Sequence, residues 1–334
     1  MDAYWNGLYL STKRPTLIEG SYVEVGDDVI YAVKGVSHPP KGVIAVPNYI
    51  RVGGSVVKLK SFNSSMDFIR RHSRKFLKYD ECLGQEVPYI PLEEITRVYD
   101  PIEGKSHLRI DAVANAALRM VDLLVENSGI ESNFVGITGS VLLGLHNESS
   151  DIDIVVYGIN NCLKVYETLR LMRESNMTGY LSGDALEKVL RPRSDTLMEP
   201  IVWAKHERRK LTNGIFMGRP YTLKLIPFPE EFWDKYGERR FKEIGRTIIR
   251  FQVNNASKGI FTPCRYEVKV TSVIEGPDIS TKVSSIVSYR SRFAEQLRDG
   301  EVGIASGRLE ISSDGELRLF VGNNPKDFLM VDSP

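Results

Sequence analysis

Residues 136–158 read GITGSVLLGLHNESSDIDIVVYG, and this stretch decides the expected fold of the central part of the chain. A short apolar run leads into Gly139-Ser140, and a second run of strong strand formers, Asp151 to Tyr157, carries Asp-Ile-Asp. Side chains alternate between the two faces of a strand, so Asp151 and Asp153 are expected on the same face, about 7 Å apart. The stretch therefore predicts a strand, a glycine turn, a short helix and a second strand that carries two carboxylates.

The chemistry of these four residues favours the binding of phosphate and metal together. Gly139 lets the backbone approach a phosphate without a Cβ in the way. The N–H groups at the following helix start attract an anion, and Ser140 adds a hydroxyl donor. Carboxylates as close as Asp151 and Asp153 repel each other unless a divalent cation lies between them, and Mg²⁺ accepts such hard oxygen ligands. This combination predicts phosphoryl or nucleotidyl transfer, in which a metal neutralises triphosphate charge and orients the attacking oxygen.

A Gly-Ser pair, ten intervening residues and Asp-x-Asp on an apolar strand resemble the signature of the DNA polymerase β-type nucleotidyltransferase superfamily. The three-part layout of the chain also resembles uncharacterised archaeal members. The resemblance implies that Gly139 and Ser140 bind a nucleoside triphosphate such as ATP. It further implies that Asp151 and Asp153 hold catalytic Mg²⁺ or Mn²⁺, while a nucleoside monophosphate passes to a hydroxyl acceptor. The domain is expected over roughly residues 105–227.

The sequence departs from this family in its third carboxylate, which usually comes from a later strand and activates the attacking hydroxyl. The later strand here runs from Tyr221 to Ile226 and has Lys224 where an acid is expected. The upstream acids considered in its place are Asp184, Asp195 and Glu199. Either the base comes from elsewhere, or the substrate completes the site, or the chain is a catalytically degenerate protein that binds nucleotide or RNA. No third catalytic carboxylate is identified from the sequence.

Hydrophobic patterning predicts an α+β fold in three parts, with a central nucleotidyltransferase-type mixed sheet and helices. The parts are a β-rich N-terminal module at 1–100, the core at 101–230, and a β-rich C-terminal module at 231–334, expected as a small barrel or compact sheet. Hairpin turns are predicted at residues 26–28, 53–54 and 313–315, and one amphipathic helix is expected from Phe68 to Leu77. In the core, helical spacing covers residues 106–126, 162–173, 184–190 and 200–211.

Several basic segments indicate which acceptor the protein uses. Because such segments suit a long, negatively charged substrate, an RNA or DNA end is favoured. The segments are residues 70–75, 205–210 and 239–246. Each is interpreted either as a contact to phosphates or as a solvated surface. Arg265, Tyr266 and residues 288–293 interleave cationic and aromatic side chains, which suits base stacking, although tyrosines in such strands more often belong to the core.

Composition sets wider limits on the class of protein. The chain has 334 residues, 42% hydrophobic and 26% charged, which is ordinary for a globular protein. Its net charge of +1 does not indicate whether the protein binds nucleic acid. The three cysteines lie far apart, so a disulfide framework or zinc site is not expected. No leader or apolar run of membrane-spanning length is recognised, which predicts a cytoplasmic protein without a membrane partner. The oligomeric state is not predicted.

Overall fold

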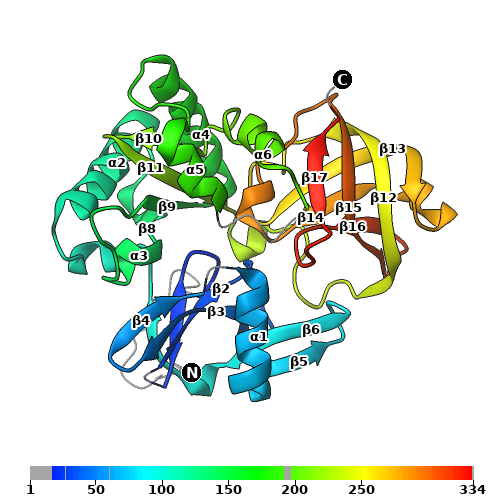
Figure 1. Cartoon of the computed structure of the whole chain (residues 1–334), viewed down its shortest axis with the longest axis horizontal. Helices are drawn as coiled ribbons and strands as arrows, with labels where there is room; N and C mark the ends of the chain where they lie inside the picture. The colour runs from blue at the N-terminus through cyan, green and yellow to red at the C-terminus, as the bar shows by residue number, and fades with distance from the viewer. Residues whose placement is uncertain (1–16, 27, 60, 192–196, 333–334) are drawn as a thin grey trace.

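The computed structural model describes residues 17–332, except residues 27, 60 and 192–196, and arranges them around three β-sheets (Figure 1). The N-terminal sheet lies at the bottom of that view, the central sheet with its helices at the upper left, and the C-terminal sheet at the right. Helices and strands both contribute strongly to the fold, so the predicted α+β class is confirmed. The division of the chain into three domains at about residues 100 and 230 stays a prediction.

The N-terminal sheet has seven strands in the order β5-β6-β3-β2-β1-β7, with β4 paired to β3. Its strands are β1 Tyr22–Val25, β2 Val29–Val33, β3 Gly42–Val52, β4 Ser55–Lys58, β5 Leu77–Asp80, β6 Gln85–Pro91 and β7 Ile95–Tyr99. The first two predicted hairpins are present, because β1 pairs with β2 and β3 pairs with β4, each pair antiparallel. The helix α1, Phe62–His72, covers this sheet through buried Met66 and Ile69.

The helix predicted to reach Leu77 is shorter than expected. It ends at His72, residues 74–76 form a single 3₁₀ turn, and Leu77 already opens β5. Phe76, whose apolar side chain suggested a continuous helix, is still buried, and its ring meets Tyr31 edge-on at 6.2 Å. Burial of Phe76 therefore needs only a turn, and helical spacing overestimated the length of α1.

The central sheet has four strands in the order β10-β11-β9-β8, with β9 parallel to β11 and the other neighbours antiparallel. The strands are β8 Val135–Ile137, β9 Ile152–Tyr157, β10 Asn213–Phe216 and β11 Arg219–Ile226. The helices of this region are α2 Ala112–Ser128, α3 Gly139–Leu142, α4 Ile159–Glu174, α5 Gly183–Leu190 and α6 Pro200–Glu207. All four predicted helical patterns are present, whereas β10 was not predicted.

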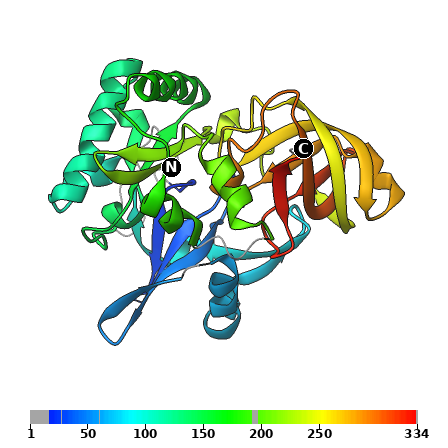
Figure 2. The same ribbon diagram turned by 45° about the horizontal axis from the view of Figure 1, so that its top comes forward.

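The two faces of the central sheet have different partners. Ile152, Ile154 and Val156 of β9 pack into the core that α2 and α4 cover, on the side away from the N-terminal sheet (Figure 2). The alternate residues Val155 and Tyr157 pack with Ile18, Val36 and Phe232 instead. Because side chains alternate along a strand, Asp153 shares the face of Val155 and Tyr157. The carboxylate of Asp153 is therefore directed toward the N-terminal sheet.

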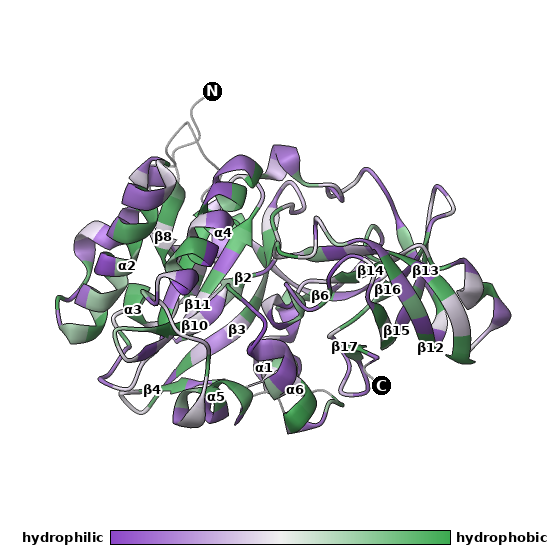
Figure 3. Cartoon of the chain, turned by 90° about the horizontal axis from the view of Figure 1, so that it is seen from above, coloured by the Kyte–Doolittle hydropathy of each residue, from purple (hydrophilic) through white to green (hydrophobic). Residues whose placement is uncertain are grey.

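The C-terminal strands form a closed ring. β12 pairs with both β13 and β15, while β14 pairs with β13 and β16, and β16 pairs with β15. A sixth strand, β17, adds to β15. The strands are β12 Phe241–Asn255, β13 Cys264–Glu275, β14 Ser285–Ser288, β15 Val302–Ser312, β16 Leu317–Phe320 and β17 Phe328–Val331. Figure 3 shows hydrophobic and hydrophilic residues alternating along β12 and β15, as expected of strands with one face in a core.

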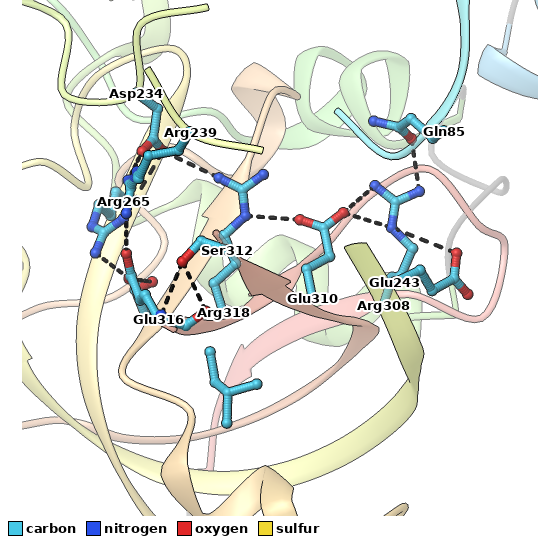
Figure 4. Close-up of polar contacts among 12 residues, drawn as sticks. Gln85, Asp234, Arg239, Glu243, Arg265, Arg308, Glu310, Ser312, Glu316 and Arg318 are labelled. Atoms are coloured by element: carbon cyan, nitrogen blue, oxygen red, sulfur yellow. Dashed lines mark hydrogen bonds and ion pairs between the residues drawn. The ribbon is translucent and has the colours of Figure 1, made fainter. Parts of the chain in front are cut away.

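Charged side chains on the C-terminal strands and in the segments next to them pair with one another (Figure 4). Arg318 bonds to Glu310 and Asp234, and Arg239 and Arg265 both pair with Glu316. Arg239 belongs to the basic segment 239–246, and its charge is paired with a carboxylate of the protein itself. Tyr266 is buried and its hydroxyl donates to the Phe293 carbonyl, so it belongs to the core and not to a stacking surface.

The basic segment 205–210 has a structural role that neither interpretation anticipated. Lys210 is buried and pairs with Glu207 at 2.9 Å, and Arg209 pairs with Glu301. Helix α6 also carries Trp203, which packs in the C-terminal core with its ring 5.6 Å from that of Phe293. The segment therefore joins the central helices to the C-terminal strands.

The cysteines and the helices give two further observations. Cys82, Cys162 and Cys264 are all free, and the last two are buried. No helix in the described part of the chain combines the length and apolar character needed to cross a membrane.

Trp203→Ala should lower the free energy of unfolding by about 3–5 kcal/mol, because it removes a large buried side chain and leaves a cavity. Ile201→Ala is the matched control on the same helix, since Ile201 is 69% exposed, and should change stability by no more than about 0.5 kcal/mol. Urea denaturation followed by circular dichroism measures both. Equal effects of the two substitutions would contradict the anchoring role of α6.

Candidate active site

Gly139 and Asp153 lie in direct contact. The predicted phosphate-binding turn and one of the two predicted metal-binding carboxylates are therefore neighbours. Gly139 has a φ of +67°, in the left-handed region that favours glycine. A Cβ on Gly139 would lie 2.1 Å from Oδ2 of Asp153 and 2.9 Å from its Cγ. A side chain at position 139 would therefore collide with the carboxylate.

Backbone hydrogen bonds fix the turn on which this contact depends. The Thr138 N–H donates to the Asp153 carbonyl at 2.9 Å, which ties the end of β8 to β9. The Leu145 N–H donates to the Ser140 carbonyl at 2.9 Å and closes the loop that follows α3. Ser140 is half-buried beside the turn, and the first N–H groups of a helix have no acceptor within the helix. The turn thus offers backbone donors and a hydroxyl close to Asp153.

The two aspartates differ in their surroundings. Burial raises the pKa of Asp153, the positive charge of Lys58 opposes this, and the negative charge of Asp151 adds to it. Asp151 lies just before β9, and its carboxylate is 34% exposed and bonded to the Lys188 ammonium of α5. A buried carboxylate beside a second one is stabilised by added positive charge. The pair therefore favours a cation at this position.

Lys58, at the end of β4, is a member of the site that the sequence did not reveal. Burial works to lower the pKa of Lys58, but Tyr49, Asp153 and Asp151 together raise it. The ammonium also lies 5.6 Å from the centroid of the Tyr49 ring. More than ninety residues separate β4 from β9 in the chain, so no local pattern could have connected them.

Lys224, found where a third acid was expected, forms an ion pair with a carboxylate from the N-terminal part of the chain. Its ammonium lies 2.7 Å from Oε1 of Glu19, and Lys34 lies 3.9 Å from the same oxygen. Burial works to raise the pKa of Glu19, but Lys224 and Lys34 outweigh it and lower the pKa. Strand register places Thr222 beside Asp153 and Lys224 beside Val155. The sheet position next to Asp153 is therefore a threonine.

The acids considered as third carboxylates do not complete the pair. Asp184 is exposed on α5, Glu199 is exposed at the start of α6, and Asp195 lies outside the described residues. Among the residues that the structure describes, no group of three or more histidine, cysteine, aspartate or glutamate side chains is placed to hold a metal ion. Two carboxylates still suit Mg²⁺, which is commonly bound by one or two carboxylates together with waters and substrate phosphates.

Comparison with known proteins identifies the central region. Residues 120–211 match the model of the nucleotidyltransferase domain, and this range contains Gly139, Ser140, Asp151 and Asp153. The recognised likeness to polymerase β-type nucleotidyltransferases is thus confirmed for this part of the chain. The match ends before β11, which completes the sheet beside β9.

An archaeal relative covers almost the whole chain. The uncharacterized protein MJ1086 of Methanocaldococcus jannaschii is 26% identical over 335 residues, which cover 92% of this chain and 96% of the relative. The expected likeness to an uncharacterised archaeal protein is confirmed. No solved structure matches the chain.

Asp153→Asn should raise stability in metal-free buffer by about 0.5–2 kcal/mol, as substitutions at electrostatically strained sites commonly do. A carboxylate whose folded pKa is raised destabilises the fold above that pKa, and the effect fades as pH falls to the unfolded pKa. The gain should therefore be present at neutral pH and disappear in acid. Thermal unfolding in EDTA across this pH range measures it.

Asp122→Asn is a suitable control, because Asp122 is exposed on α2. It should leave the midpoint of unfolding nearly unchanged at every pH. A lower midpoint for Asp153→Asn than for the wild type at neutral pH would contradict the electrostatic account of the pair.

Proposed function

We propose that the chain is a Mg²⁺-dependent nucleotidyltransferase that moves a nucleoside monophosphate from a nucleoside triphosphate to a hydroxyl acceptor. The nucleotidyltransferase domain supports nucleoside monophosphate transfer in general. The choice of metal, of ATP or another nucleotide, and of acceptor belongs to the proposal. An RNA or DNA end, which the sequence favoured, is one candidate acceptor.

The proposal gives each site residue one role. Gly139 and Ser140 bind the triphosphate, with backbone N–H groups and the Ser140 hydroxyl as donors. Asp151 and Asp153 hold the metal, which when bound neutralises the phosphate charge and polarises the α-phosphorus. The acceptor oxygen forms a bond to the α-phosphorus as the bond to the bridging oxygen breaks. Pyrophosphate leaves with that electron pair, and the hydroxyl proton passes to water.

The observation that carries this proposal is the contact between Gly139 and Asp153. A Cβ-free turn held against a buried carboxylate lets a phosphate and a metal ligand share one small space. The raised pKa of Asp153 adds support, because burial and Asp151 both make the carboxylate favour a cation. Lys188, already bonded to Asp151, gives the phosphates a further cation at the same place.

A second candidate function is a catalytically degenerate protein that binds nucleotide or RNA. The observation in its favour is that the described residues bring no third carboxylate to Asp151 and Asp153. Such a protein would bind nucleotide with metal and release it unchanged. Label transfer separates the two functions, because binding alone moves no label to an acceptor.

Incubation with Mg²⁺ or Mn²⁺, each α-labelled nucleoside triphosphate and a pool of acceptors that includes total RNA should give acid-stable label transfer. Asp151→Ala/Asp153→Ala should reduce the rate at least about a hundredfold, because the metal supplies several kcal/mol of charge stabilisation. Asp184→Ala/Glu199→Ala is a charge-matched control and should retain activity. Metal-dependent nucleotide binding without label transfer to any acceptor would favour the degenerate protein.

Gly139→Ala should weaken Mg²⁺·ATP binding by about tenfold or more, because the new methyl group displaces the Asp153 carboxylate. Gly144→Ala is the matched control: its φ of +66° brings the same backbone strain, but its Cβ would meet no atom within 4 Å. Isothermal titration calorimetry measures both affinities. Equal loss in the two variants would show that backbone strain, and not the contact with Asp153, causes the effect.

A further inference from the structure

A cavity of about 370 Å³ lies between the N-terminal sheet and the C-terminal strands. Strand β3, the start of α1 and strand β6 form one side, and residues 289–292 with β16 form the other. Its volume is within the usual range for small-molecule sites, about 300–1,000 Å³. The predicted motif residues are not part of its lining, but Lys58 is, so the cavity adjoins the candidate active site.

Positive charge dominates the lining of this cavity. Five cationic side chains line it against two carboxylates: Lys34, Lys58, Arg290, Arg292 and Arg318 against Glu19 and Glu86. Arg318 is neutralised by Glu310 and Asp234, and Figure 4 shows it fixed in that network. Burial lowers the pKa of Lys34, Glu19 opposes this, and Lys224, Arg290 and Arg292 lower it further. The group that suits the part of the cavity around Lys34 is therefore an anion.

The remaining walls are apolar and aromatic. Tyr289 and Phe320 both line the cavity, and their rings stack at 5.8 Å with an interplanar angle of 27°. Ile44, Val46 and Val87 line the side of the N-terminal sheet. A molecule that has a charged group and a less polar body fits such walls better than a free inorganic ion does.

The other end of the cavity reaches the candidate active site. Lys58 lines the cavity and is also in electrostatic contact with Asp153 and Asp151. Glu19 lines it as well, and its Oε1 lies 3.9 Å from the Lys34 ammonium and 2.7 Å from that of Lys224. Lys224 lies on β11, two residues beyond Thr222, the neighbour of Asp153 in the sheet. A ligand bound at Lys34, Arg290 and Arg292 is therefore separated by the Glu19–Lys224 ion pair from the face of the central sheet that bears Asp153.

We propose that this cavity is the acceptor site and that it takes a phosphorylated small molecule with a free hydroxyl. Its phosphate binds at Lys34, Arg290 and Arg292, and its hydroxyl is directed toward Asp153. The inference rests on the proposed nucleotidyl transfer and names its acceptor class. The reaction joins that hydroxyl oxygen to the α-phosphorus of the nucleotide and releases pyrophosphate, with the hydroxyl proton passing to water.

Two observations favour a small molecule over the end of a polynucleotide. The volume of the cavity suits a molecule of about nucleotide size. Several cations of the basic segments, among them Arg209, Lys210 and Arg239, are committed to ion pairs within the protein. They offer no continuous track for a phosphate backbone of the kind that long nucleic acids require.

Calorimetric titration of the full chain with inorganic phosphate, in EDTA and at low salt, tests the anion site. Saturable binding is expected, and Arg290→Gln/Arg292→Gln should weaken it by about tenfold or more, as loss of hydrogen bonds to a charged group does. Arg70→Gln/Arg71→Gln removes the same charge from the exposed face of α1 and should leave affinity unchanged. Asn48→Phe, which narrows the cavity and keeps all its cations, is a second variant that should also weaken binding.

Unchanged phosphate affinity in both cavity variants, each shown by circular dichroism to be folded, would overturn the inference.

Label transfer from α-labelled ATP then identifies the acceptor. Phosphomonoester metabolites and total RNA are offered together, and the labelled products are separated by size. Label in the small fraction, lost in Arg290→Gln/Arg292→Gln, supports the inference. Label on RNA that this variant leaves intact overturns it while the proposed function stands. Absence of label from every fraction counts against the proposed function. The phosphate titration still tests whether the cavity binds an anion.

Discussion

The close approach of Asp153 to Gly139 is the constraint on which the rest of the structure depends. Strand β9 can place a carboxylate against the turn only if position 139 lacks a Cβ and its backbone is left-handed. The hydrogen bond from Thr138 to the Asp153 carbonyl fixes the two strands at that separation. The arrangement confines a negative charge in a partly desolvated space, which is unfavourable until positive charge joins it.

The N-terminal sheet supplies part of that positive charge through Lys58, and the N-terminal part of the chain covers the face of the central sheet that bears Asp153. Gly20 lies so close to β9 that a Cβ there would be 2.8 Å from Val155. The same part of the chain places Lys58 where its charge acts on the aspartates and places Glu19 beside Lys224. Buried ion pairs seldom increase stability over apolar packing, and the Glu19–Lys224 pair lies on the face of the sheet that bears Asp153. The candidate site thus draws on the central sheet and on the N-terminal strands.

The sequence was informative where the structure depends on neighbouring residues. Strand β9, the glycine turn and the hairpins of the N-terminal sheet follow from local alternation and turn chemistry. Strand β12 was missed because its first residues were interpreted as a basic segment, although its buried positions, such as Ile249, Phe251 and Val253, alternate. Lys58 and Glu19 could not be found, because only the packing of distant segments brings them to Asp153. The burial of Lys210 was missed in the same way, since its ammonium also donates to the Arg292 carbonyl from a distant part of the chain.

The most direct measurement is a crystal structure with Mn²⁺ and a non-hydrolysable nucleoside triphosphate, in which anomalous scattering locates the metal. The account predicts a manganese peak between the carboxylates of Asp151 and Asp153. It also predicts that the triphosphate contacts the backbone of Gly139 and the hydroxyl of Ser140. The Lys188 ammonium, which pairs with Asp151 in this structure, should then contact a phosphate instead. A nucleotide bound elsewhere, or a metal that touches neither aspartate, would contradict it.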